Sequence, residues 1–167
     1  MEKLEIVPAI IPKTPDKVLE VKYPGNVKVD NGNQLTVDQT SKPPTVEWEA
    51  KEDAFYTLLM IDPDAPSRSN PKKAEWQHWL IGNIPGKNVK AGDVIIDYNG
   101  PTPPKNSGLH RYIFLVYEQP TGKISFKEKK IPKDSSEGRA NFSIKDFSSK
   151  YKLNTPIAGN VCQVERS

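Results

Sequence analysis

The chain has 167 residues, with 24 Lys and Arg against 21 Asp and Glu, so its net charge is only +3. This length suits a single domain over residues 1–167, and the scattered, nearly balanced charge argues against nucleic acid as a partner. One cysteine, Cys162, excludes an internal disulfide. The first residues lack the basic and apolar segments of a signal peptide. We therefore expect a cytoplasmic monomer with at most peripheral membrane contact.

Sixteen prolines and ten glycines divide the sequence into short segments, which favours a β-rich fold. Residues 19–23 alternate apolar and charged side chains, as a half-exposed strand does. Residues 26–36 predict two short strands around Asn31-Gly32, a strong hairpin signal. Residues 45–50 alternate again and predict another strand.

The most apolar runs lie in the middle of the chain. Residues 55–61 form a continuous apolar run that predicts a central buried strand. Residues 76–84 and 110–119 predict two more strands. Residues 123–131 alternate apolar and charged side chains, which predicts an edge strand with a charged outer face.

Near the end the apolar period changes to that of a helix. Ala140, Ile144, Phe147 and Tyr151 follow one another at steps of four, three and four residues, which places them on one helix face. Ser143 and Asp146 have the spacing of a capping box, which predicts that Ser143 precedes the first turn of this helix. The residues thus predict a β-sandwich-like core with one or two short helices.

Polar residues that could bind a ligand or take part in catalysis lie at the ends of these strands. Asp62 follows the run 55–61, and the flanking prolines Pro63 and Pro66 stop the strand, so that Asp62 and Asp64 are held on a rigid loop. Asp62 can orient a histidine through a ring N–H, or pair with an ammonium group on a ligand.

The only two histidines lie at the start of apolar segments. Residues two apart in a strand share a face, so Trp76 points with His78, and His110 points with Tyr112. The loop 98–108 is rich in Gly and Pro and brings backbone N–H groups within reach of a ligand. Imidazole, hydroxyl and amide donors around one cavity suit an anion. By the same alternation, Trp76 and Trp79 should lie on opposite faces.

Each of these residues also has a purely structural explanation. Asp62 and Asp64 suit loop caps, and the histidines and Tyr112 suit the core. A metal site is disfavoured because the HxH and HExxH spacings are missing. A Ser–His–Asp hydrolase is disfavoured because GxSxG is missing and because Ser67 and Ser107 read as ordinary loop serines. We therefore expect no metal, no cofactor and no catalytic residue.

Three segments in this order, "DPDAPSR", "EWQHWL" and "GLHRYIFLVYEQ", resemble the phosphatidylethanolamine-binding protein family, which includes the Raf kinase inhibitor protein. The resemblance extends from "VLEVKYPG" to "PIAGN". It implies an antiparallel Greek-key β-sandwich with short peripheral helices. It also implies a small pocket for phosphate or phosphorylethanolamine head groups, formed by Asp62, Trp76, His78, Gly100, Pro104, His110 and Tyr112.

The same resemblance assigns a structural role to the loop around Asp64 and Pro66, with a cis peptide before Pro66. The sequence departs from the family pattern at Lys73, where an aromatic residue is common, and at Thr102, where a second glycine is common. It also stops at "CQVERS", where many relatives continue into a helix beside the pocket. We therefore expect a more exposed and weaker site.

The resemblance implies a non-enzymatic binding protein that modulates signalling proteins such as kinases. A serine protease inhibitor is an alternative, although no inhibitory loop stands out. A hydrolase with Asp62 and His78 as an acid–base pair is a weaker alternative, because a nucleophile is missing. A carrier of whole lipids would need a cavity for acyl chains, which a small polar pocket does not provide.

Overall fold

The computed structural model describes residues 1–166. This part of the chain forms ten strands, one α-helix and one 3₁₀ turn. In chain order they are β1 (Lys17–Val18), β2 (Glu20–Tyr23), β3 (Val27–Lys28), β4 (Asn33–Leu35), β5 (Thr45–Glu47), β6 (Phe55–Asp62), β7 (Trp76–Pro85), η1 (Val89–Ala91), β8 (Asp93–Ile96), β9 (His110–Glu118), α1 (Ile144–Lys150) and β10 (Ala158–Val164). In residues 1–166, no helix has both the length and the apolarity needed to cross a bilayer.

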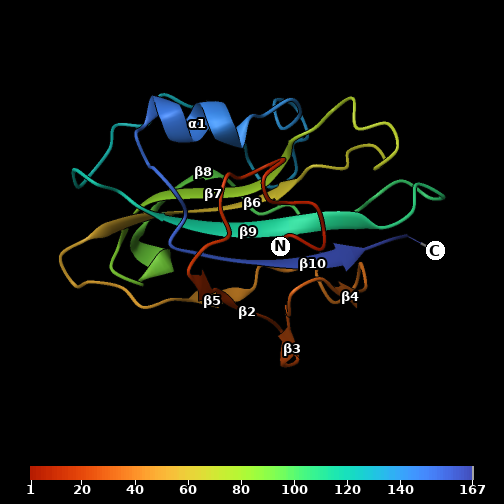
Figure 1. Ribbon diagram of the computed structural model, residues 1–167, viewed down its shortest axis with the longest axis horizontal. Helices are drawn as coiled ribbons and strands as arrows, with labels where there is room; N and C mark the ends of the chain where they lie inside the picture. The colour runs from red at the N-terminus through yellow and green to blue at the C-terminus, as the bar shows by residue number, and fades with distance from the viewer. Residues whose placement is uncertain (167) are drawn as a thin grey trace.

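The strands form two sheets in separate layers. The large sheet has the order β1-β10-β9-β6-β7-β8, with β4 also paired to β10, and the small sheet has the order β3-β2-β5. Figure 1 shows α1 on one side of the large sheet and the small sheet on the other. The expected mostly β sandwich with short peripheral helices is confirmed. Its long strands pair antiparallel, whereas β1 and β4 run parallel to β10.

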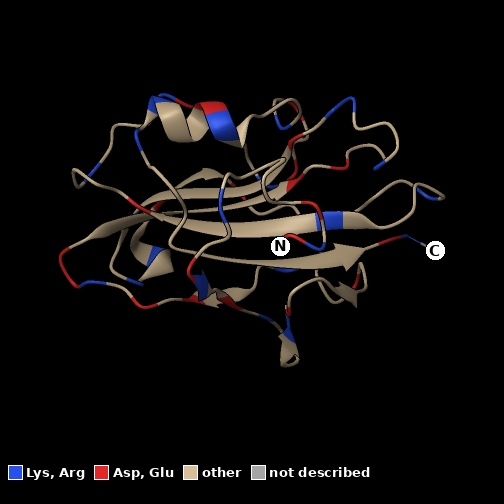
Figure 2. Ribbon diagram, in the orientation of Figure 1, with Lys and Arg blue, Asp and Glu red and all other residues tan. Residues whose placement is uncertain are grey.

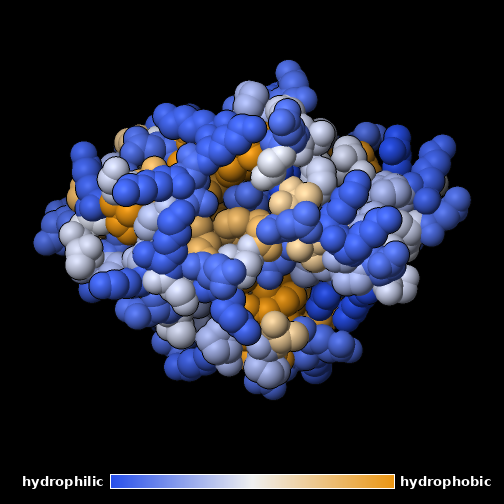
Figure 3. All heavy atoms as spheres, turned by 90° about the horizontal axis from the view of Figure 1, so that it is seen from above, coloured by the Kyte–Doolittle hydropathy of each residue, from blue (hydrophilic) through white to orange (hydrophobic). Residues whose placement is uncertain are grey.

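Each face of the large sheet is covered by its own apolar core. Met60 and Phe114 lie in the core between the two sheets, and Ile61 and Ile113 lie in the core beneath α1. This division follows from the two-residue period of β6 and β9, whose continuous apolar runs supply side chains to both faces. Seen from the side of α1, apolar residues lie in recesses between projecting hydrophilic side chains (Figure 3).

The strongest sequence patterns predicted their elements. The runs 55–61, 76–84 and 110–119 correspond to β6, β7 and β9. The helix begins at Ile144, and the hydroxyl of Ser143 accepts a hydrogen bond from the backbone N–H of Asp146 at 3.1 Å. This is the expected cap, which satisfies one of the free N–H groups of the first turn.

The hairpin prediction around Asn31-Gly32 is wrong. The turn itself forms, and both residues have positive φ angles of 45° and 99°. The strands on its two sides do not pair, however: β3 joins β2 in the small sheet, while β4 joins β10 in the large one. The turn is docked on β10, because Asn31 N–H donates to the side chain of Asn160 and Gly32 N–H donates to the carbonyl of Val161.

The edge strand predicted over 123–131 is also wrong. Within this range only Ile131 makes a β-bridge, with Ile96 of β8. Its alternating apolar side chains pack on the face of the large sheet that α1 covers. Phe126 lies against Gly82, where any Cβ atom would collide with its ring. The period of two therefore reflects a segment that crosses a sheet face rather than one that extends the sheet.

Candidate functional site

Asp62 is a buried carboxylate, only 3% exposed, at the end of β6. One carboxylate oxygen accepts from Nδ1 of His110 at 2.8 Å, and the other accepts from the backbone N–H of Asp64 at 2.7 Å. Asp62 therefore has the first of the two roles considered for it: it orients a histidine. Both of its oxygens are already engaged by protein donors.

His110 is held from both ring nitrogens. Its Nε2 lies 2.9 Å from the hydroxyl oxygen of Ser107, and that hydroxyl donates to the carbonyl of Pro104 at 2.6 Å. Since a hydroxyl has one proton, Ser107 accepts from Nε2, and Nδ1 donates to Asp62. These two contacts fix the orientation of the imidazole ring. No pattern in the sequence indicated this role of Ser107 beyond its position three residues before His110.

The order Asp62–His110–Ser107 is superficially that of a hydrolase triad. In such a triad the histidine accepts the hydroxyl proton of the serine. Here that proton points toward the Pro104 carbonyl, and Nε2 donates to the serine oxygen. The arrangement therefore orients the imidazole and does not activate Ser107 as a nucleophile.

His78 lies at an irregularity in β7. The ladder between β6 and β7 changes register at this residue: Trp79 pairs with Met60, and Trp76 pairs with Asp62. Because directly paired residues share a face, both tryptophans lie on the face of Met60 and Asp62. The prediction that they lie on opposite faces is wrong, since alternation along a strand holds only where no bulge interrupts it.

The two ring nitrogens of His78 have different environments. Nδ1 donates to the carbonyl of Asn99 at 2.5 Å, and within residues 1–166 Nε2 has no hydrogen-bond partner. Burial lowers the pKa of His78, although the nearby Asp62 carboxylate acts in the opposite direction. The ring is therefore neutral at pH 7, with Nε2 as an acceptor that becomes a donor once it is protonated.

Tyr112 lies close to both imidazoles. Its ring centroid is 5.2 Å from that of His78, nearly edge-to-face, and 6.3 Å from that of His110, nearly parallel. Burial and the neighbouring Asp62 carboxylate raise the pKa of Tyr112 far above its ordinary value. The phenol therefore keeps its proton and remains a potential hydrogen-bond donor.

These side chains border one pocket of about 230 Å³. Its lining residues are Asp62, Ala65, Pro66, Lys73, Trp76, His78, Asn99, Thr102, Pro103, Pro104, His110 and Tyr112. Both departures from the family pattern, Lys73 and Thr102, are among them. Lys73 is the only lysine in this lining and brings a positive charge to it. The volume suits a head group rather than an acyl chain.

Two of the predicted residues lie outside this lining. Gly100 borders a neighbouring cavity of about 200 Å³, and a Cβ atom there would lie 2.7 Å from the carbonyl oxygen of Thr40. Asp64 is 1% exposed and accepts three hydrogen bonds from Arg111. These contacts join the loop that carries Asp64 to Arg111 of β9. The peptide between Ala65 and Pro66 is cis, as the resemblance implied.

Glu75, next to the pocket residue Trp76, links the pocket wall to α1. Its carboxylate accepts from the backbone N–H of Ile144 at 2.8 Å. Burial is the largest influence and raises the pKa of Glu75 to about 7, with a further contribution from Asp146. In the folded protein, therefore, this carboxyl gains its charge close to neutral pH.

We expect Glu75→Gln to stabilise the fold at pH 8 and to change it little at pH 4. The unfolded pKa is about 4.3, so the folded state holds an extra proton between that pH and about 7. The contribution of this proton to the unfolding free energy is lost as pH rises through that window. Glutamine keeps the acceptor for Ile144 without the buried charge. Urea unfolding should show a gain of about 1–2 kcal/mol at pH 8; an equal gain at both pH values would contradict this assignment.

Comparisons with known proteins identify a family for this chain. A family model described as phosphatidylethanolamine-binding protein matches residues 25–164. The chain is 40% identical over 163 residues to a Drosophila melanogaster protein named "Putative odorant-binding protein A5", covering 98% of this chain and 77% of that protein.

Solved structures show the same fold. A phosphatidylethanolamine-binding protein from Plasmodium vivax superposes with a TM-score of 0.81 at 26% identity, covering 99% of this chain and 95% of the other. A carboxypeptidase Y inhibitor, crystallised with its cognate proteinase, superposes with a TM-score of 0.77 at 28% identity, covering 92% and 85%. The family model spans more than half of the chain and includes the whole pocket. The chain therefore belongs to the phosphatidylethanolamine-binding protein family.

Proposed function

We propose that this protein binds a phosphate-type anion, either free or as a head group such as phosphorylethanolamine, in the pocket between His78 and Lys73. The free Nε2 of His78 carries this proposal. Both nitrogens of His110 already have protein partners, whereas Nε2 of His78 has none within residues 1–166. Lys73 supplies a cation to the same small pocket. The wider role that we infer is regulation of signalling proteins such as kinases, by a cytoplasmic monomer.

Binding of an anion at this position should change the protonation of His78. Without a bound anion the neutral ring is favoured, because burial lowers the pKa of His78. A bound anion stabilises the imidazolium, whose Nε2 then donates a hydrogen bond. The ligand and one proton are therefore expected to bind together.

We expect sulfate to bind more tightly as the pH falls from 8 to 6. Sulfate keeps its charge over this range, so any pH dependence comes from the protein. Uptake of one proton gives up to about a tenfold gain in affinity per pH unit. NMR titration should show saturable shifts at His78, Tyr112 and Lys73. Phosphate and phosphorylethanolamine, titrated in the same way, distinguish a free anion from a head group.

Two variants and a matched control test the assignment. His78→Ala and Lys73→Ala should each weaken binding by about tenfold, and His78→Ala should also abolish the pH dependence. Lys72→Ala removes the same charge from an exposed residue outside the pocket lining and should leave affinity unchanged. Shifts confined to other surfaces, or equal effects of Lys72 and Lys73, would contradict the proposal.

The alternative of an Asp62–His78 hydrolase receives no support from the hydrogen bonds. Asp62 pairs with His110, and Nδ1 of His78 donates to the backbone of Asn99. The two residues proposed as an acid–base pair are thus engaged with different partners. We propose that the protein acts by binding without turnover.

A second candidate function is proteinase inhibition, and the structural likeness to a proteinase inhibitor supports it. If this function applies, the purified protein should slow a serine carboxypeptidase with saturable, reversible kinetics. Inhibition that persists in His78→Ala would place the contact surface away from the anion pocket. Absence of inhibition at micromolar protein would exclude this candidate for that class of enzyme.

A further inference from the structure

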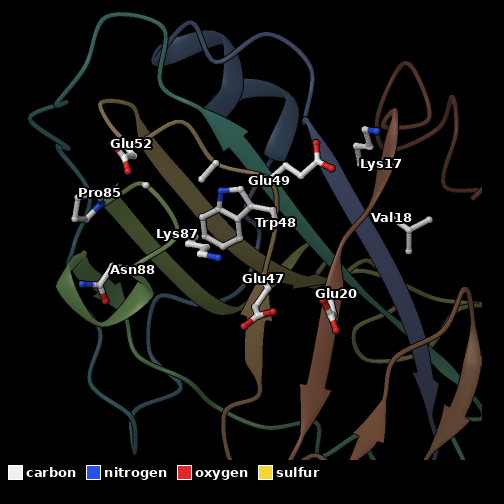
Figure 4. A pocket seen from close by; sticks show the side chains of 12 residues that line it. Lys17, Val18, Glu20, Glu47, Trp48, Glu49, Glu52, Pro85, Lys87 and Asn88 are labelled. Carbon is white, nitrogen blue, oxygen red and sulfur yellow. The ribbon is translucent and has the colours of Figure 1, made fainter.

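A second and larger cavity lies at the edge of the small sheet. It is a groove of about 760 Å³ that shares no lining residue with the anion pocket. Figure 4 shows the strand that carries Glu47 beside the strand that carries Glu20, and the turn with Pro85 and Asn88 on its other side. The lining residues are Lys17, Val18, Glu20, Glu47, Trp48, Glu49, Ala50, Glu52, Pro85, Gly86, Lys87 and Asn88.

The groove is acidic on a protein with a net positive charge. It contains four glutamates and two lysines, a local charge of 2 − 4 = −2, whereas the whole chain carries +3. Figure 2 shows acidic residues on β2, on β5 and on the segment after β5. Within residues 1–166, none of these glutamates lies within ion-pair distance of a lysine, arginine or histidine. Their charges remain available to a partner.

Two of these carboxylates face each other across a strand pair. Glu20 and Glu47 are direct partners in the ladder between β2 and β5. Like charges in this position destabilise a sheet. The pairing is unfavourable for the isolated protein and becomes favourable when a cationic side chain lies between the two carboxylates.

Trp48 provides an independent sign of a missing partner. Its side chain is 8% exposed and packs on Tyr56, with ring centroids 5.6 Å apart. Its indole Nε1 is buried and has no hydrogen-bond partner among the described residues. In Figure 4 the indole lies in the middle of the groove, with its nitrogen toward the side of Glu52 and Pro85. An indole N–H can only donate, so an acceptor such as a backbone carbonyl would satisfy it.

The backbone of the groove is suited to an extended segment. β5 is the last strand of the small sheet, so one of its edges has no neighbouring strand among residues 1–166. Such an edge offers unpaired N–H and C=O groups that a peptide can complete. Val18, 65% exposed, adds an apolar contact at the rim.

We propose that this groove binds an extended peptide segment, rich in lysine or arginine, from a partner protein. The basic side chains lie among Glu20, Glu47 and their neighbours, and the peptide backbone runs along β5 and accepts from Trp48. A small cation satisfies the charges but leaves the indole N–H and the strand edge without partners. The proposal does not depend on the anion pocket.

The test uses the whole protein and the probe peptide acetyl-Lys-Val-Lys-Val-Lys-Val-amide, whose alternating pattern places lysines on one side of a strand. We expect saturable binding that weakens with added salt, together with a downfield shift of the Trp48 Nε1–H resonance, assigned with Trp48→Phe. Glu47→Lys should weaken binding by at least about tenfold. Its Tm should stay equal or rise, because lysine then faces Glu20.

The matched control is Glu137→Lys, the same charge change at an exposed residue outside the groove, and it should leave affinity within about twofold. An unmoved Trp48 resonance at saturation, or equal losses in both variants, would overturn the proposal. So would equally tight binding of the peptide with glutamate in place of lysine. Spermidine that matches the peptide in affinity and in resonance shifts would show a simple cation site and would also overturn it.

Discussion

Asp64→Asn is expected to lower the free energy of unfolding by about 3–5 kcal/mol. Asp64 is 1% exposed, and its two oxygens accept from the backbone N–H, Nε and Nη2 of Arg111 at 2.7–2.9 Å. Asparagine keeps the shape but removes the counter-charge, and it turns an amide N–H₂ toward the guanidinium. Because Arg111 is only 8% exposed, its charge would remain largely buried without a partner.

Urea unfolding at pH 7 measures this loss, with Asp16→Asn as the matched control. Asp16 forms an ion pair at the surface: its side chain is 81% exposed and lies 3.7 Å from Lys13. Exposed pairs of this kind contribute little, so the control should change stability by less than about 0.5 kcal/mol. Equal losses in both variants would show that burial of the Asp64 pair has no special weight.

Part of the candidate site could be predicted from the sequence, because several of its residues lie near strand ends. Asp62 and Asp64 lie two residues apart, and the pattern of a buried run followed by Asp and Pro placed them at a strand end, where β6 ends at Asp62. His110 and Tyr112 were placed on one face by alternation, and the structure puts both in the pocket lining. Local patterns were sufficient here because each of these residues lies at or near the end of an uninterrupted strand.

Patterns failed where a long-range partner decides the structure. β10 is a central strand between β9, β1 and β4, yet residues 158–164 mix small, polar and apolar residues and gave no strand signal. The register change at His78 has no signature in the sequence. Because of it, Trp79 lies on the same face as Trp76 and not on the opposite face, as alternation predicted. The hydrogen bond from His110 to Ser107 depends on how the loop 98–108 folds back. Such contacts depend on tertiary packing and not on the hydrophobic periodicity of the sequence.

Arg139 is the clearest such case, and Arg139→Met is the second large effect that we expect. The residue is 0% exposed, and its guanidinium donates to four backbone carbonyls, those of Ser135, Pro132, Gln77 and His78. Within residues 1–166 no carboxylate lies within ion-pair distance of it. Its role is to join β7 to the segment 132–139.

Two opposing contributions set the size of this effect. Methionine leaves the carbonyls unpaired, at about 1–3 kcal/mol for each group that water cannot reach. It also removes a buried charge, and the lowered pKa of Arg139 shows that burial disfavours that charge. We expect a net loss of about 3 kcal/mol. Arg68→Met, at an exposed arginine 3.9 Å from Glu5, is the control and should cost less than about 0.5 kcal/mol.

The same substitution tests whether Arg139 also influences the anion pocket. Its positive charge is one of the influences that lower the pKa of His78, and its Nη1 lies 3.3 Å from the carbonyl of that residue. Removing the charge should therefore raise the pKa of His78, as followed by NMR of the imidazole, and extend sulfate binding to higher pH. If stability falls while the His78 titration stays unchanged, Arg139 acts only as a structural tie. If both change, one buried cation both holds β7 and keeps the pocket histidine neutral.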